Sequence, residues 1–133
     1  MDSASAIGIF IGAGLGAWLR WALGIALNPV FPTMPLGTLA ANTLGGLLMG
    51  MAMAAFAQFE ALSPMLRLTL LTGFLGGLTT FSTFSGETVT QLLRGEYGWA
   101  ATTIVSHLIA SLGATLAGIG LTRWIITATG ATT

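Results

Sequence analysis

The chain has 133 residues, of which 54% are hydrophobic and only 6% are charged, and its formal net charge at pH 7 is zero. Soluble domains usually carry about a quarter charged residues, so this chain has too few to cover a water-soluble fold of its size. The composition predicts an integral membrane protein and argues against nucleic acid as a partner. The absence of cysteine excludes a disulfide bond and a thiol nucleophile.

Four apolar segments follow one another along the chain, at residues 7–27, 36–59, 68–93 and 99–126. A helix needs about 20 residues to cross the hydrocarbon core of a bilayer, and each segment is long enough. The alternating pattern typical of membrane barrel strands is absent. We therefore predict an all-α integral membrane protein in which residues 1–133 form a single domain of four transmembrane helices.

The first segment contains the run GAGLGA at residues 12–17. Such glycines also occur in dinucleotide-binding loops, but no strand precedes this run and no acidic residue lies about twenty residues downstream. Small residues at four-residue spacing let membrane helices approach closely, and we favour this interpretation. Arg20, near the end of the segment, either extends its charge to the membrane edge or attracts anions to a vestibule.

The second segment carries Asn42 in the run TLAANTLGG. An amide supplies two N–H donors. Within a membrane span, such a group either makes a hydrogen bond to a neighbouring helix or faces a functional path. Both interpretations stay open from the residues alone.

The third segment carries the run GFLGGLTTFSTFSGE at residues 73–87. The adjacent glycines Gly76 and Gly77, followed by hydroxyl residues, predict a break in the helix near Gly76-Gly77. Membrane helices break where the freed backbone lines a cavity or binds an ion. Carbonyl groups at the end of the first half would face a cation, and amides at the start of the second half would face an anion.

Beyond the predicted break, residue types repeat every three positions. The repeat puts like residues on shared helix faces: Phe81 with Phe84, Ser82 with Ser85, and Thr80 with Thr83. The rings and hydroxyls could be ordinary packing with hydrogen bonds back to the helix. However, so many hydroxyls favour a polar path, and the positive edges of aromatic rings could compensate a dehydrated anion without binding it tightly.

The fourth segment places His107, Ser111 and Thr115 at four-residue steps, and therefore on one helix face. A lone imidazole without a second histidine or a cysteine is more often a packed residue than a metal ligand, so we assign His107 no role. No pair of titratable groups is placed for acid–base chemistry, and the sequence therefore predicts that the protein is not an enzyme.

The arginines do not give the chain a preferred orientation. Arg67 and Arg123 lie toward one side of the predicted bundle, and Arg20 and Arg94 lie toward the other. The positive-inside rule counts basic residues, and here the count is balanced. Either another feature fixes the orientation, or the chain inserts both ways and forms an inverted homodimer, which we favour.

These residues resemble the Fluc (CrcB) family of fluoride channels. The resemblance rests on GFLGGLTTFSTFSGE, on PLGTLAANTLGG in the second segment and on GAGLGAWLRW in the first, and it covers nearly the whole chain. Members are passive fluoride channels built as inverted (antiparallel) homodimers with two pores. The resemblance implies export of cytoplasmic fluoride, which lowers its toxicity, across a bacterial inner membrane that the chain crosses several times.

The resemblance also implies roles for individual residues. The fluoride pore would contain Asn42, Phe81, Phe84, Ser82, Thr83, Ser85, Ser111 and Thr115. Arg20 and Glu87 match the family's first-span arginine and third-span acid, as vestibule or supporting residues. Backbone carbonyls of Gly76 and Thr79 would hold a structural Na⁺ that is not transported.

The main alternative is a dual-topology, proton-coupled exporter that resembles the small multidrug resistance family. Such a protein would share the size, the dimer and the charge balance. It would need an acid in the first span, whereas the acid well inside a span here is Glu87, in the third. A non-transporting assembly factor would explain the small-residue packing but not the repeat of phenylalanine and hydroxyl residues.

Overall fold

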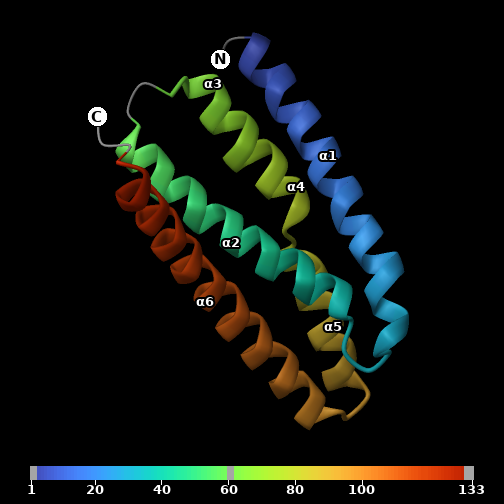
Figure 1. The fold of residues 1–133 in the computed structure, drawn as a ribbon. Coiled ribbons are helices and arrows are strands. Elements are labelled where there is room, and N and C mark those ends of the chain that lie inside the picture. The colour runs from blue at the N-terminus through green and yellow to red at the C-terminus, as the bar shows by residue number, and fades with distance from the viewer. Residues whose placement is uncertain (1–2, 60–61, 131–133) are drawn as a thin grey trace.

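The computed structural model of the chain describes residues 3–59 and 62–130. Within these ranges the fold is all-helical, with short connections and no strand, as the sequence predicts. Figure 1 shows a bundle of long helices. The elements are α1 (Ser3–Leu27), η1 (Asn28–Val30), α2 (Leu36–Gln58), α3 (Pro64–Arg67), η2 (Leu68–Leu75), α4 (Gly76–Leu78), α5 (Phe81–Leu93) and α6 (Tyr97–Thr129).

Three helices of the described ranges are long and apolar enough to cross a membrane, namely Ser3–Val30, Leu36–Gln58 and Tyr97–Thr129. They match three of the four predicted spans. Large apolar side chains lie on the outside of the bundle, and Phe10 and Leu116 are 80% and 70% exposed. A surface of this kind suits contact with lipid or with another protein better than contact with water.

The remaining predicted span, the third segment at residues 68–93, is divided into two helical parts. The first part winds from α3 through the π-helical η2 to α4, and α5 follows after an extended connection. The break lies at Thr79 (φ −84°, ψ 154°) and Thr80 (φ −150°, ψ 113°). The break predicted near Gly76-Gly77 is therefore present, but it begins two residues beyond Gly77, because both glycines remain helical.

The two threonines make the break with their own side chains. Thr79 Oγ1 donates to the carbonyl of Leu75 at 2.8 Å, beside the last backbone hydrogen bond of the helix. Thr80 Oγ1 accepts from the backbone N–H of Thr83 at 3.1 Å and so caps the N-terminus of α5. Threonine hydroxyls compete with backbone groups in this way, and they are among the favoured N-caps.

Glycines serve instead for close helix packing, as the small-residue spacing predicts. A Cβ atom at Gly16 of α1 would lie 2.7 Å from the backbone nitrogen of Leu78, and one at Gly77 would lie 2.9 Å from the carbonyl carbon of Ala13. Between α2 and α6, a Cβ atom at Gly46 would lie 2.6 Å from the carbonyl oxygen of Ser111. Real Cβ atoms do not approach backbone so closely, so these helix pairs depend on glycine.

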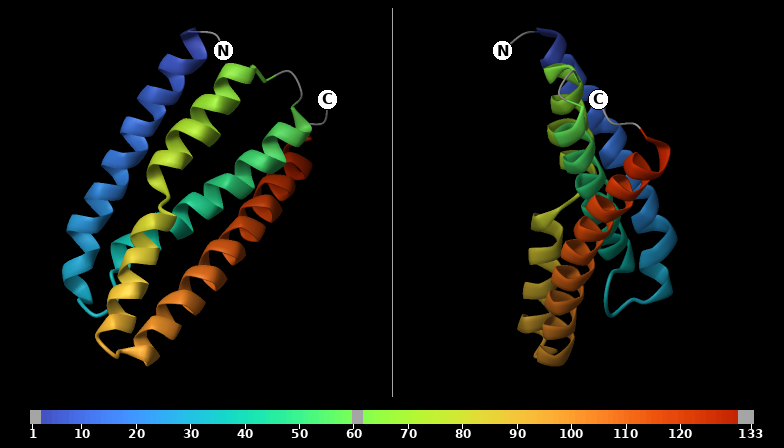
Figure 2. Two further views of the ribbon diagram at one scale, coloured as in Figure 1. Left: turned by 180° about the vertical axis from the view of Figure 1, so that it is seen from behind. Right: turned by 60° about the vertical axis from the view of Figure 1, so that its left-hand side comes forward.

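The break passes the chain from one neighbour to another. Before it, η2 and α4 pack against α1; after it, α5 packs mainly against α6, which also lies along α2. The views in Figure 2 show α5 beside α6 and the preceding part between α1 and α2. The small buried core of Ala41, Leu75 and Leu78 lies where α2 meets the last turns before the break. The residues before and after the break therefore pack against α1, α2 and α6.

Candidate functional site

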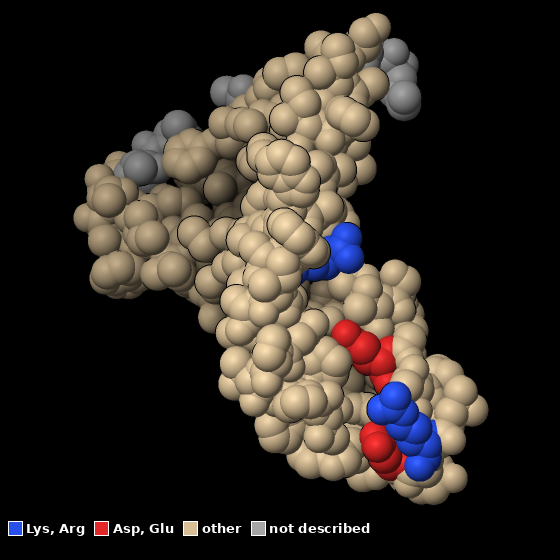
Figure 3. Space-filling model, turned by 90° about the vertical axis from the view of Figure 1, so that its right-hand side faces the viewer, with Lys and Arg blue, Asp and Glu red and all other residues tan. Residues whose placement is uncertain are grey.

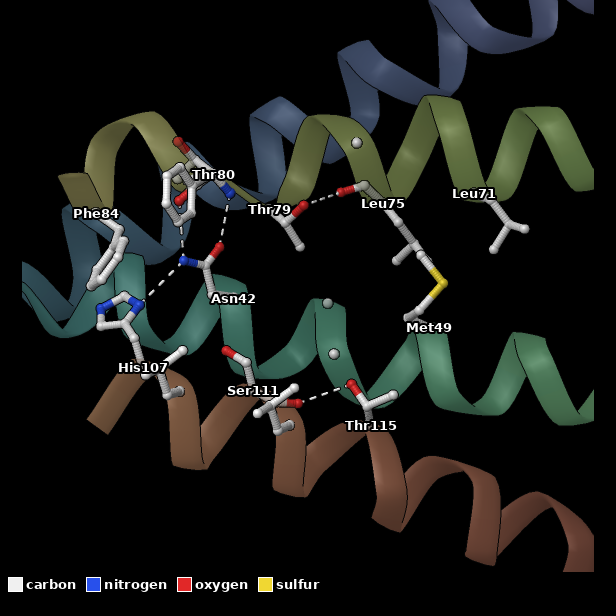
Figure 4. Close-up of a pocket in the computed structure, with 16 residues that line it drawn as sticks. Asn42, Met49, Leu71, Leu75, Thr79, Thr80, Phe84, His107, Ser111 and Thr115 are labelled. Atoms are coloured by element: carbon white, nitrogen blue, oxygen red, sulfur yellow. Dashed lines mark hydrogen bonds between the residues drawn. The ribbon is translucent and has the colours of Figure 1, made fainter. Parts of the chain in front are cut away.

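An open groove of about 480 Å³ lies beside the break, between α2, α6 and the residues on both sides of Thr79 and Thr80 (Figure 4). It brings together many of the side chains and backbone groups that the sequence singled out. The predicted site residues along it are Asn42, Gly76, Thr79, Phe81, Phe84, Ser111 and Thr115. Segments far apart in the sequence therefore share one site.

Asn42 joins α2 to the break. Its Oδ1 accepts from the backbone N–H of Thr80 at 2.8 Å, and its Nδ2 donates to the Thr80 carbonyl at 3.1 Å. The same Nδ2 lies 3.3 Å from Nδ1 of His107 on α6. The amide thus satisfies the Thr80 N–H that the break removes from the helix and adds a second donor to the Thr80 carbonyl, which is a structural task beyond the predicted contact with an ion.

The bonds of Thr80 and Thr83 release two carbonyl oxygens from the helical pattern. In a continuous α-helix, Gly76 O would accept from Thr80 N–H and Thr79 O would accept from Thr83 N–H. Thr80 N–H instead binds Asn42, and Thr83 N–H binds Thr80 Oγ1. These are the carbonyls predicted to hold Na⁺. Neutral carbonyl oxygens suit a hard cation, so the residues present fit the ion.

The two phenylalanines of the repeat lie against each other at the groove. The ring centroids of Phe81 and Phe84 are 5.6 Å apart, with planes inclined by 57°. Phe84 is half-buried and its ring lies 4.6 Å from that of His107. Phe81 is 79% exposed in the single chain. The predicted shared face is present, and the two rings have different surroundings.

His107, to which the sequence assigned no role, contacts two of the predicted pore residues. It is only 5% exposed, and its ring lies beside Phe84 and its Nδ1 beside Asn42. Its other ring nitrogen, Nε2, is buried without a hydrogen-bond partner. The four-residue spacing of His107 and Ser111 in the sequence indicates that the two residues share a helix face, and both line the groove.

Ser111 and Thr115 share one face of α6, as their spacing predicts, and both line the groove. Thr115 Oγ1 donates to the carbonyl of Ser111 at 2.9 Å, so this hydroxyl is bonded to its own helix. Its oxygen can still accept, and its proton can be redirected by rotation about the side-chain bond. Thr115 therefore lines the groove with a polar group whose hydroxyl already has a hydrogen-bond partner.

Three hydroxyl residues of the repeat, Ser82, Thr83 and Ser85, do not line this groove. Thr83 faces two polar depressions on another side of α5, and Ser82 Oγ lies 3.2 Å from Thr80 Oγ1. Ser85 is half-buried and lines neither the groove nor these depressions. The structure thus gathers the phenylalanines of the repeat and Thr80 at the groove, and leaves Ser82, Thr83 and Ser85 outside its lining.

Arg20 and Glu87 border the polar depressions. Arg20 Nε donates to the carbonyl of Gly77 at 3.0 Å, and its depression also contains Thr38 and Thr83. Thr38 Oγ1 donates to Glu87 Oε1 at 2.6 Å, a contact that nothing in the sequence suggested. Figure 3 shows the charged atoms of this face gathered toward one end, with the rest uncharged. The arrangement places polar and charged groups beside the break without bringing a charge into the groove.

Comparison with known proteins identifies the family. Residues 7–119 match the model of the family described as "CrcB-like protein, Camphor Resistance (CrcB)". The chain belongs to the CrcB family. The matched range includes every residue of the groove described above.

This CrcB-family chain is similar to proteins named "Fluoride-specific ion channel FluC". It is 60% identical to the one from Nitrosospira multiformis over 114 residues, which cover 86% of this chain and 89% of the relative. It is 54% identical to the one from Burkholderia pseudomallei over 117 residues, covering 88% and 90%. It is 61% identical to the one from Aromatoleum aromaticum over 101 residues, covering 76% and 77%.

Family membership and the long apolar helices together make this chain a multi-pass membrane protein. The relatives are named as ion channels, not as enzymes. In a CrcB-family protein, the groove beside the break is therefore a candidate ion site rather than a catalytic one.

Proposed function

We propose that this protein is a fluoride-selective passive channel through which cytoplasmic fluoride leaves the cell. The observation that carries the proposal is the groove at the helix break, where the Asn42 amide and two phenylalanine rings lie near hydroxyls of α6. These are the weak, neutral partners that a dehydrated anion requires. The relatives named as fluoride-specific channels supply the identity of the anion.

The lining of the groove suits the passage of an anion better than its tight binding. Among the described residues, the groove is lined by apolar, amide, hydroxyl, glycine and imidazole groups and by no carboxylate or guanidinium. A pore must compensate dehydration without holding the ion so tightly that it cannot leave. An inside-negative potential contributes about 2.3 kcal/mol per charge per 100 mV, so an outward leak of the anion needs no further energy source.

The proposal includes an antiparallel homodimer with two pores, in which each chain is one domain of four spans. The divided run from Pro64 to Leu93 would be the span that the three long helices leave missing. The groove is open on one side, and Phe81 at its edge is 79% exposed, so a second copy could complete the lining. The balanced arginines allow the two copies to insert in opposite directions.

The proposal also includes a structural Na⁺ at the centre of the dimer. One chain supplies only two carbonyl oxygens for it, those of Gly76 and Thr79. A second copy related by a twofold axis would double the number of oxygens. The ion would then hold the breaks of the two chains together without being transported.

We further propose the bacterial inner membrane as the location, since the relatives come from bacteria. The test is ion efflux from liposomes that contain the purified protein, with a potassium ionophore to clamp the potential. Fast fluoride efflux without chloride efflux, and without any requirement for a proton gradient, supports the channel. Efflux that occurs only with a proton gradient, or no fluoride efflux at all, would exclude it and favour the exporter.

A further inference from the structure

The orientation of the Asn42 amide follows from its contacts with the backbone of Thr80. An N–H can only donate and a carbonyl can only accept, so the amide atom facing Thr80 N–H is Oδ1 and the one facing Thr80 O is Nδ2. The opposite orientation would place donor against donor and acceptor against acceptor. One proton of Nδ2 is therefore committed to Thr80, and the second points toward His107.

This orientation in turn decides the protonation of His107. Because Asn42 Nδ2 is a donor, Nδ1 of His107 at 3.3 Å has to be the acceptor. His107 is then neutral, with its proton on the buried Nε2. The ring of Phe84, 4.6 Å away, fixes the plane of the imidazole, and Figure 4 shows Nδ1 turned toward Asn42.

We propose that His107 is a positioning residue whose Nδ1 occupies the place of the transported anion at the second N–H of Asn42. The contact with His107, at 3.3 Å, is the longest of the three that Asn42 makes, so it is the one that an anion displaces. When the ion leaves, Nδ1 accepts the proton again. This inference rests on the proposed fluoride channel.

Such a replacement acceptor has two consequences for transport. A half-buried donor without a partner is costly, and His107 removes this cost whenever the groove holds no ion. The same bond competes with the ion, which weakens ion binding and speeds release. His107 therefore lowers the affinity for the ion and raises the rate at which the ion leaves.

The experiment compares two variants of the full-length protein in liposomes over a range of fluoride concentrations. His107→Phe keeps a ring against Phe84 and removes the acceptor, whereas His107→Asn keeps an acceptor oxygen near the position of Nδ1 and removes the ring. We expect His107→Phe to lower both the half-saturating fluoride concentration and the maximal flux by about two- to tenfold, the effect of one lost competing hydrogen bond. His107→Asn should keep the half-saturating concentration of the wild type.

An unchanged half-saturating concentration in His107→Phe, or an equal shift in both variants, would reduce His107 to a packing residue. A second measurement does not depend on any variant. The chain has a single histidine, so ¹⁵N-histidine labelling and NMR report on His107 alone. We expect an unprotonated Nδ1 whose resonance shifts when fluoride, but not chloride, is added.

The two proposals fail in different ways. A flux-competent protein with a protonated Nδ1, or with an Nδ1 resonance that does not respond to fluoride, overturns the role of His107 and leaves the channel intact. A wild-type protein without fluoride flux overturns the channel and the exchange of acceptors together.

Discussion

The side-chain amide of Asn42 pairs with both backbone polar groups of Thr80, accepting at 2.8 Å and donating at 3.1 Å. It thus takes the place of a neighbouring peptide group at the point where the helix is interrupted. An extended backbone inside an apolar bundle requires such a partner, because unpaired peptide groups are costly there. Asn42 of α2 therefore makes the break in the third apolar segment possible.

We predict that Asn42→Ala destabilises the protein as well as impairing transport. The substitution leaves the Thr80 N–H without its partner and removes a donor from the Thr80 carbonyl, which should lower the free energy of unfolding by on the order of 1–3 kcal/mol. Thermal unfolding in detergent measures the effect. Thr43→Ala, the neighbouring position on α2 beside an apolar depression, is the control and should be much milder; equal unfolding temperatures for the two variants would contradict the structural role.

We predict that Phe81→Ile and Phe84→Ile each lower fluoride flux about three- to tenfold, because one aromatic contact is worth roughly 1 kcal/mol and isoleucine has no positive ring edge. Both variants should still fold, since volume changes little. Liposome efflux is the measurement. Phe31→Ile is the matched control, because Phe31 packs against Trp99 (centroids 5.4 Å apart) away from the groove. Normal flux in both groove variants would make these rings mere packing.

We predict that Gly16→Ala weakens the contact of α1 with the helix before the break. Its methyl group would meet the carbonyl oxygen of Phe74 and lie 2.7 Å from the nitrogen of Leu78. Backbone cannot move aside cheaply, so we expect a loss of about 1–3 kcal/mol in unfolding. Gly14→Ala, on the same helix with nothing within 4 Å of the added atom, should be neutral. A neutral Gly16→Ala would mean that α1 does not pack this closely.

We predict that Glu87→Gln keeps fluoride flux within about tenfold of the wild type, because exchanging a charged for a neutral acceptor changes the bond to Thr38 by roughly 1 kcal/mol. Glutamine can accept the 2.6 Å hydrogen bond that Thr38 donates to Oε1. A permanent charge in an anion path would also repel the ion. Liposome efflux is again the measurement, with Glu96→Gln, in the same polar depression, as the control. Complete loss of flux in a folded Glu87→Gln protein would instead indicate proton-coupled transport.

Hydrophobic pattern and residue spacing predict the helices of this protein well and the break less well. The apolar segments mark the long helices to within a few residues, because their length and composition depend only on local sequence. The position of the break depends on Asn42, which is distant in the chain and reaches Thr80 rather than the glycines. The adjacent glycines predict a break through their backbone freedom, whereas Gly77 is needed for its small size against Ala13.

For the groove as well, contacts within one helix can be predicted from the sequence, whereas contacts between helices cannot. The spacing of Phe81 with Phe84, and of His107 with Ser111, correctly indicates shared faces. The sequence could not reveal that His107 meets Asn42, because this contact is made across two helices. It also could not separate the face of Thr83 from that of Phe84 in function, since both belong to one repeat.

The helix α6 has 33 residues, and its length can be compared with the thickness of the bilayer. From Trp99 to Trp124 it rises by about 38 Å, at about 1.5 Å per residue. That distance is longer than a hydrocarbon core of about 30 Å, yet it fits between the two headgroup regions where tryptophan prefers to lie. In a thinner membrane α6 has to tilt. Because Gly46 brings α2 into backbone contact with α6 at Ser111, the two helices tilt together.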